Sequence, residues 1–103
     1  MAQIVITHQN FEKEVLNSDL PVLVDFWSDW CSPSRMMLPI MEQIAEEYEG
    51  KVKIGMINVD DEHGLAMRFR IGGVPTLMVF KNGRPTRQVF GLLSKSQIEK
   101  MLE

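Results

Sequence analysis

The chain has 103 residues, an ordinary size for one compact unit, and we predict a single domain over residues 1–103. It carries 11 basic and 14 acidic side chains, and the net charge of -3 argues against a nucleic acid or an anionic membrane as a partner held by charge. No apolar run reaches the length of a membrane span, and the N-terminus lacks the order of a signal peptide. One cysteine rules out an internal disulfide and favours a reducing compartment, the cytoplasm.

The first half of the chain alternates between strand and helix patterns. A short apolar run at residues 4–6 predicts a strand, and apolar side chains at positions 11, 15 and 16 predict a short helix. Residues 22–27 form an almost continuous apolar run, which is typical of a strand covered on both faces. Apolar residues then recur at helical spacing from 37 to 48. This pattern predicts a helix that is kinked by Pro39 and ended by Gly50.

The second half ends in a hairpin and a helix. Residues 52–59 predict a third strand, 62–69 a short helix and 76–80 a fourth strand. Asn82 and Gly83 tolerate a positive φ, which predicts a turn into an antiparallel strand at 86–90. Ser94 and Gln97 have the spacing of a capping box and predict the start of a last helix. The order β-α-β-α-β-α-β-β-α indicates an α/β fold with three parallel strands and helices on both faces of the sheet.

Cys31 lies between the predicted buried strand and the helix that follows it. Free backbone amides and the helix dipole at that point favour a thiolate over a thiol. Pro33 suits the first turn of the helix, because its missing N–H group costs nothing there. An inert, packed cysteine is the alternative interpretation. The position of the thiol, with Trp30 directly before it, favours a reactive cysteine.

Asp25 is an acidic residue inside an apolar strand. A carboxylate in such surroundings is costly unless it is neutral or paired, so we predict that Asp25 is buried and has a raised pKa. A raised pKa makes this carboxylate a candidate proton acceptor for a neighbouring thiol. A solvated position at a strand end is the alternative.

The sequence resembles the thioredoxin family over residues 3–103. The resemblance rests on separate motifs in the same order, namely Val24 to Arg35, Pro39, Ile57 to Asp60, Ile71 to Gly83, and Gly91. It implies the thioredoxin fold, a central five-stranded mixed sheet of order 1-3-2-4-5 flanked by four helices. It also implies a protein-disulfide reductase that binds no cofactor and receives electrons from NADPH through thioredoxin reductase.

The resemblance assigns roles to three residues of the active site. Cys31 matches the nucleophilic cysteine, Asp25 the buried proton acceptor, and Ser34 the position of the resolving cysteine. Family members mostly have Cys-Gly-Pro-Cys where this chain has Cys-Ser-Pro-Ser, so the second thiol is missing. We expect the Ser34 hydroxyl to donate a hydrogen bond to the Cys31 thiolate. Met56 stands where many members have a lysine, and the loss of that cation should raise the Asp25 pKa further.

The resemblance also implies a flat apolar surface on which an extended substrate segment docks by strand addition. Pro75 matches a cis-proline opposite the active site, a state that the sequence alone does not show. The residues expected on this docking surface are Trp30, Ser32, Pro33, Gly73, Val74, Pro75 and Gly91. No metal site is predicted, because His8 and His63 are isolated and far from Cys31 in the sequence.

Three functions are open at this point. The first is a thioredoxin-type reductase in which Ser34 replaces the resolving cysteine, most simply by engineering, so that the reaction stops at the mixed disulfide. The second is a natural monothiol enzyme that uses glutathione to release Cys31. The third is a non-catalytic binding module that uses the surface around Trp30. We expect a monomer with thioredoxin reductase and protein disulfides as partners, and a Cys31-linked dimer as a second form.

Overall fold

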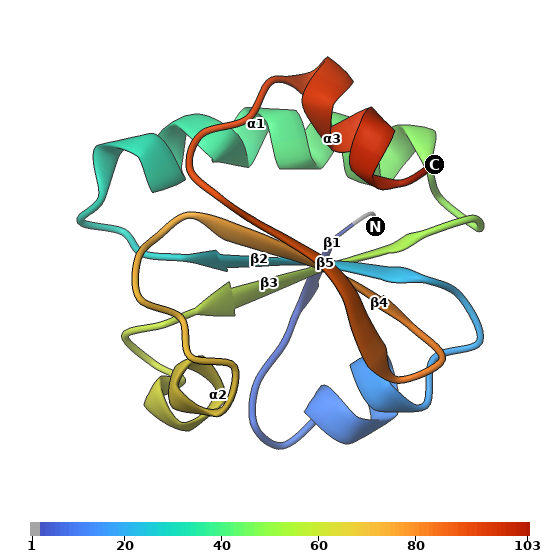
Figure 1. Cartoon of the computed structure of the whole chain (residues 1–103), viewed down its shortest axis with the longest axis horizontal. Coiled ribbons are helices and arrows are strands. Elements are labelled where there is room, and N and C mark those ends of the chain that lie inside the picture. Colours follow the sequence, from blue (N-terminus) through green and yellow to red (C-terminus); the bar gives the residue numbers. More distant parts are fainter. Residues whose placement is uncertain (1–2) are drawn as a thin grey trace.

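A single mixed sheet organises the chain, and the computed structural model describes residues 3–103 (Figure 1). Its strands are β1 (Gln3–Val5), β2 (Val22–Trp27), β3 (Lys53–Asn58), β4 (Thr76–Lys81) and β5 (Arg84–Phe90). The spatial order is β1-β3-β2-β4-β5. Strands β1 and β2 run parallel to β3, whereas β4 runs antiparallel to both β2 and β5. The predicted α/β class and the order 1-3-2-4-5 are confirmed.

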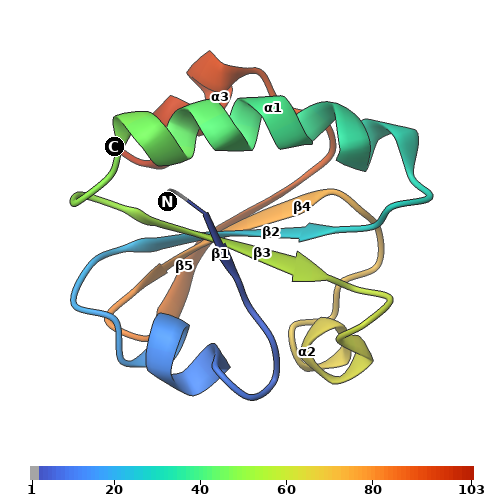
Figure 2. The same cartoon turned by 180° about the vertical axis from the view of Figure 1, so that it is seen from behind.

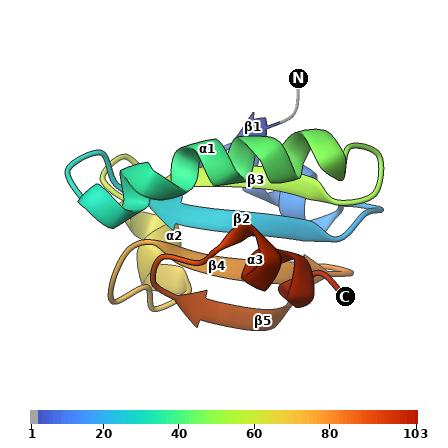
Figure 3. The same ribbon diagram turned by 90° about the horizontal axis from the view of Figure 1, so that it is seen from above.

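Helices cover both faces of the sheet (Figures 1 and 2). Helices α1 (Ser32–Glu47) and α3 (Lys95–Met101) lie on one face, and the short helices η1 (Glu12–Leu16) and α2 (His63–Arg68) lie on the other. Seen from above, α1 lies over the side of the sheet that holds β3, and α3 lies over the side that holds β4 (Figure 3). Within residues 3–103, every helix is too short or too polar to cross a membrane.

The sheet separates two apolar cores, because successive side chains of a strand point to opposite faces. In β2, Leu23 packs in the core beneath α1 and α3, while Val22, Val24 and Phe26 pack in the core that faces η1 and α2. By the same alternation, the side chain of Asp25 points to the α1 face. The central strand is therefore buried on both faces, as its apolar run predicted.

Two local sequence signals are confirmed in the C-terminal part. Asn82 and Gly83 have φ values of 54° and 79° and form the turn between β4 and β5. Ser94 caps α3, because its hydroxyl accepts a hydrogen bond from the Gln97 amide, while the Gln97 side chain accepts one from the Ser94 amide. These contacts hold the end of the hairpin and the start of the last helix in place.

The structure differs from the predicted elements at their ends and in one helix type. The first helix is a π-helix of five residues rather than an ordinary α-helix. Helix α1 passes through Pro39 and ends at Glu47, before Gly50, which has a φ of 82° in the turn that follows. Strand ends move by one or two residues, because hydrogen bonding to neighbouring strands, and not apolar character alone, decides where a strand stops.

We predict that Gly83→Ala destabilises the protein by roughly 2 kcal/mol, since a side chain is strained at positive φ. A Cβ at this position would also lie 2.8 Å from the backbone oxygen of Leu16. Gly64→Ala is the matched control, because a Cβ there meets nothing within 4 Å and alanine favours a helix. Urea unfolding measures both variants, and equal free energies of unfolding would contradict the prediction.

Candidate active site

Cys31 is the N-cap residue of α1, directly after the segment that leaves β2. Its backbone is extended, with φ of -96° and ψ of 115°, and its carbonyl oxygen accepts a hydrogen bond from the Arg35 amide at 3.1 Å. The Cys31 amide donates to the Ser28 carbonyl oxygen at 3.3 Å. The thiol is partly exposed at the positive end of a 16-residue helix, as the strand-to-helix position predicted.

The thiol of Cys31 faces the loop that precedes β4. Its Sγ donates to the carbonyl oxygen of Val74 at 3.4 Å, and the Val74–Pro75 peptide bond is cis. The Pro75 carbonyl oxygen in turn accepts a hydrogen bond from the Gly91 amide at 2.8 Å. The fold thus links the start of α1, the loop before β4 and the segment after β5 through consecutive contacts. The cis state implied by the family resemblance is confirmed.

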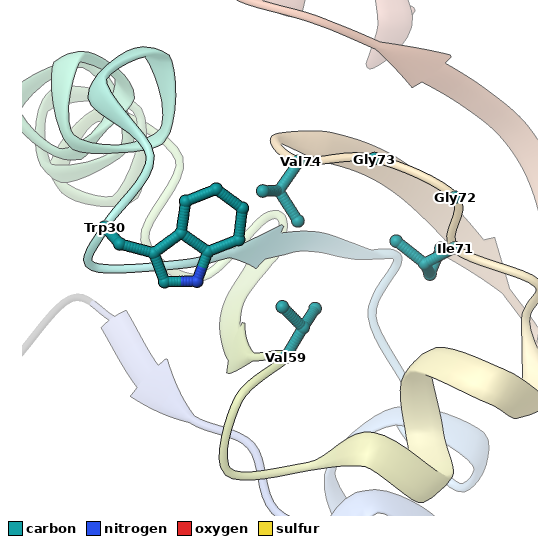
Figure 4. A pocket seen from close by; sticks show the side chains of 6 residues that line it. All are labelled: Trp30, Val59, Ile71, Gly72, Gly73 and Val74. Atoms are coloured by element: carbon teal, nitrogen blue, oxygen red, sulfur yellow. The ribbon is translucent and has the colours of Figure 1, made fainter.

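A hollow of about 200 Å³ lies beside this loop and is closed on one side by Trp30 (Figure 4). It is lined by Trp30, Val59, Ile71, Gly72, Gly73 and Val74. The indole is 71% exposed and faces Val59 and Val74 across the hollow. The lining is apolar, so the hollow suits the apolar side chain of a docked segment.

Asp60 holds the Trp30 indole, a contact that the sequence analysis missed. Its Oδ1 accepts from the Trp30 Nε1 at 3.3 Å, and its Oδ2 accepts from the buried Ser28 hydroxyl at 2.6 Å. The hydrogen bond from Ser28, followed by that from Trp30, lowers the pKa of Asp60. The only signal in the sequence was the position of Asp60 at the end of the Ile57 to Asp60 motif.

The residues expected on the docking surface differ in their exposure. Trp30, Ser32 and Pro33 are exposed, and Gly73, Val74 and Gly91 are partly exposed, whereas Pro75 is buried. The substrate contact expected of Pro75 stays a prediction, and its burial leaves little of the side chain for such a contact. The hydrogen bond between the Pro75 carbonyl oxygen and the Gly91 amide ties this part of the loop to the segment after β5. Val74, one residue earlier, is partly exposed.

Asp25 is fully buried, and neither carboxylate oxygen has a hydrogen-bond partner in the described part of the chain. Its neighbours across the sheet are Met56 in β3 and Leu77 in β4. Burial without a partner raises the pKa of Asp25 from 3.8 to about 7. The predicted burial and raised pKa are confirmed, and the alternative of a solvated strand end is wrong. The further effect of Met56 in place of a lysine stays a prediction.

Ser34 is also fully buried, and its hydroxyl has no hydrogen-bond partner within residues 3–103. The expected hydrogen bond from Ser34 to Cys31 is absent, and the Cys31 thiol bonds to Val74 instead. The reason is local. Cys31 precedes the first turn of α1, whereas Ser34 is inside it, on the buried face shared with Met37 and Met41. Buried polar groups without partners are costly, so Ser34 and Asp25 both weaken the fold.

The described residues contain no cluster of three or more histidine, cysteine, aspartate or glutamate side chains that could hold a metal ion. His8 instead bonds through its Nδ1 and its amide to one carboxylate oxygen of Glu62.

Comparison with known proteins gives one consistent family. The family model described as Thioredoxin matches residues 2–103. Thioredoxin 1 of a Nostoc species is 44% identical over 95% of this chain and 92% of its own length. Thioredoxin of Porphyra purpurea is 47% identical over 94% of this chain and 91% of its own length. Thioredoxin of Pseudomonas aeruginosa is 40% identical over 95% of this chain and 91% of its own length.

We predict that Asp25→Asn removes a pH dependence of stability. The folded protein binds more protons than the unfolded chain between about pH 4 and 7, so its free energy of unfolding falls as the pH rises through this range. Above pH 7 the free energy of unfolding is roughly 4 kcal/mol lower than below pH 4, since one pKa unit corresponds to about 1.4 kcal/mol. Urea unfolding from pH 4 to 8 measures it. Asp61→Asn, an exposed control, should keep the slope, and a slope unchanged in Asp25→Asn would refute the prediction.

We predict that Asp60→Ala lowers the free energy of unfolding, because it leaves the buried Ser28 hydroxyl without its acceptor. It should also speed hydrogen exchange of the Trp30 indole N–H, which loses its partner. NMR spectra of the indole groups and urea unfolding measure the two effects. Asp61→Ala is the control, since Asp61 is exposed. An unchanged Trp30 resonance in Asp60→Ala would show that Asp60 does not hold the indole.

Proposed function

The chain belongs to the thioredoxin family, and from this premise we propose that it is a thiol–disulfide oxidoreductase that attacks protein disulfides with Cys31. One observation carries the proposal. A partly exposed thiol lies at the start of a 16-residue helix, 3.4 Å from the Val74 carbonyl oxygen and next to an apolar hollow. This arrangement supports a role for the sulfur atom as a nucleophile that an extended segment can reach.

The first step is an attack by the Cys31 thiolate on one sulfur of a substrate disulfide. The substrate S–S bond breaks, a Cys31–substrate disulfide forms, and the other substrate sulfur leaves as a thiolate with the electron pair. The positive end of α1 stabilises the attacking thiolate. Loss of the thiol proton also frees the Val74 carbonyl oxygen, which can then accept a backbone N–H of the substrate in a strand-addition contact.

The second step is missing in this chain, because Ser34 has no sulfur. In the family a second cysteine at this position attacks the mixed disulfide and releases the substrate. A carboxylate with a pKa of about 7 suits the transfer of that thiol's proton near neutral pH, and Asp25 supplies one on the α1 face. Asp25 is a suitable proton acceptor, but this chain has no second thiol to give it a proton. This mismatch supports the view that Ser34 replaces a cysteine, most simply by engineering. The mixed disulfide then persists until an external thiol releases it.

The partners follow from this chemistry. We infer that thioredoxin reductase, fed by NADPH, and protein disulfides are the partners, and that the protein itself holds no cofactor. A cytoplasmic location fits a mechanism that needs one free thiol. The protein is expected to be a monomer when reduced. An exposed sulfur without a resolving partner can also join two chains, and electrophoresis without a reducing agent tests for this Cys31-linked dimer.

We predict that Ser34→Cys converts a single reaction into repeated turnover. The unmodified chain should form a stable mixed disulfide with insulin, which mass spectrometry can detect. It should not turn over with thioredoxin reductase and NADPH. Ser34→Cys should consume NADPH continuously, because the second sulfur can now attack the mixed disulfide.

Two control variants sharpen this test. Ser32→Gly restores the other departure from the family motif without adding sulfur, and it should not turn over. Cys31→Ser should form no adduct. Turnover by the unmodified chain with glutathione would favour the natural monothiol enzyme. If Cys31 reacts with no disulfide in either the unmodified chain or Ser34→Cys, the protein is a binding module and the proposal is wrong.

A further inference from the structure

A second hollow lies next to the one beside Trp30. Its volume is about 300 Å³, and it is lined by Gly72, Gly73, Thr76, Gln88 and Phe90. It shares Gly72 and Gly73 with the Trp30 hollow, but its other walls come from β4 and β5. The loop that faces Cys31 therefore has a hollow on each side, and one extended segment on this loop can reach both.

Phe90 forms one wall of the second hollow in an unusual way. The side chain is 68% exposed, yet its ring lies directly against Gly73. A Cβ on Gly73 would lie 2.5 Å from the Cε1 atom of the Phe90 ring, so the contact exists only because residue 73 has no side chain. An aromatic face is thereby held at the edge of the loop, where it is open to a ligand.

Gln88 supplies the free polar group of this hollow. It lies two residues before Phe90 in β5, so both side chains point to the same face of the sheet. The Thr76 hydroxyl is already committed as a donor to the Gly73 carbonyl oxygen at 2.7 Å. The Gln88 side chain is exposed, and its carboxamide can both donate and accept a hydrogen bond.

We propose that this hollow is a second substrate subsite, which receives a tyrosine side chain of the peptide segment whose disulfide reacts with Cys31. The inference rests on the proposed function, because that function places the segment on the loop. A segment paired with Val74 advances about 3.3 Å per residue, so one or two residues carry it past Gly73. The tyrosine ring packs against Phe90 and the glycine backbone, and its hydroxyl bonds to the Gln88 amide.

The test uses short peptides with one cysteine, activated as a mixed disulfide with 5-thio-2-nitrobenzoate. Cys31 attacks the peptide sulfur, the peptide–nitrobenzoate S–S bond breaks, and the coloured thiolate leaves with the electron pair. Each of the three positions on either side of the cysteine carries alanine, phenylalanine or tyrosine in turn. Every rate is divided by the rate of the same variant with the symmetric nitrobenzoate disulfide, which reports Cys31 reactivity alone.

We expect one position at which tyrosine reacts about 2- to 10-fold faster than alanine, the range given by one aromatic contact. In Phe90→Ala the ratio of the tyrosine rate to the alanine rate should fall to near one. In Gln88→Ala the advantage of tyrosine over phenylalanine should disappear, while that of phenylalanine over alanine persists. Arg84→Ala, on the same strand but outside the hollow, should keep both preferences.

The proposal is overturned if peptides with alanine, phenylalanine and tyrosine react at equal rates at every position, or if the preference for tyrosine survives in Phe90→Ala. A parallel measurement needs no reaction at Cys31. Peptides with serine in place of cysteine are titrated into the protein, and the NMR signal of the Gln88 side-chain amide should move with the tyrosine peptide but not with the alanine peptide. A lack of reaction with the symmetric disulfide would therefore refute the proposed function, while equal NMR shifts would refute the subsite.

Discussion

The burial of β2 on both faces is the constraint on which the active site depends. The strand pairs with β3 on one side and β4 on the other, and apolar cores cover both of its faces. The C-terminal end of β2 is therefore held in a fixed position relative to the loop before β4. The chain leaves β2, turns through Ser28 and starts α1 at Cys31, so a rigid strand and a rigid helix hold the thiol from both sides. The contact between Cys31 and Val74 follows from this geometry.

The same burial explains the cost that the fold carries at Asp25 and Ser34. Both groups are fully buried without partners, one in the central strand and one in the first turn of α1. A protein selected for stability alone would fill these positions with apolar side chains. Unpaired polar groups at an active site are typical of residues kept for chemistry. Under the proposed function, Asp25 would serve a thiol at position 34, where this chain has Ser34.

The surface around the thiol includes loop backbone and two large exposed side chains, Trp30 and Phe90. Trp30 is held by Asp60 on one side of the loop, and Phe90 lies against Gly73 on the other. Gly73 leaves room for the Phe90 ring, which a side chain at that position would displace. Under the proposed function, such a surface would recognise a peptide first by its extended backbone and then by a few side chains.

Periodicity and turn chemistry are local properties, so the sequence by itself determined the order of the elements, the hairpin at Asn82 and Gly83, the cap at Ser94, the burial of Asp25 and the strand-to-helix position of Cys31. The family resemblance added the strand order and the cis state of Pro75. Tertiary structure alone decided that Cys31 bonds to Val74 and not to Ser34, that Pro75 is buried, and that Asp60 holds Trp30. These contacts join residues about 30 to 43 positions apart, and only the packed sheet brings such residues within hydrogen-bond distance.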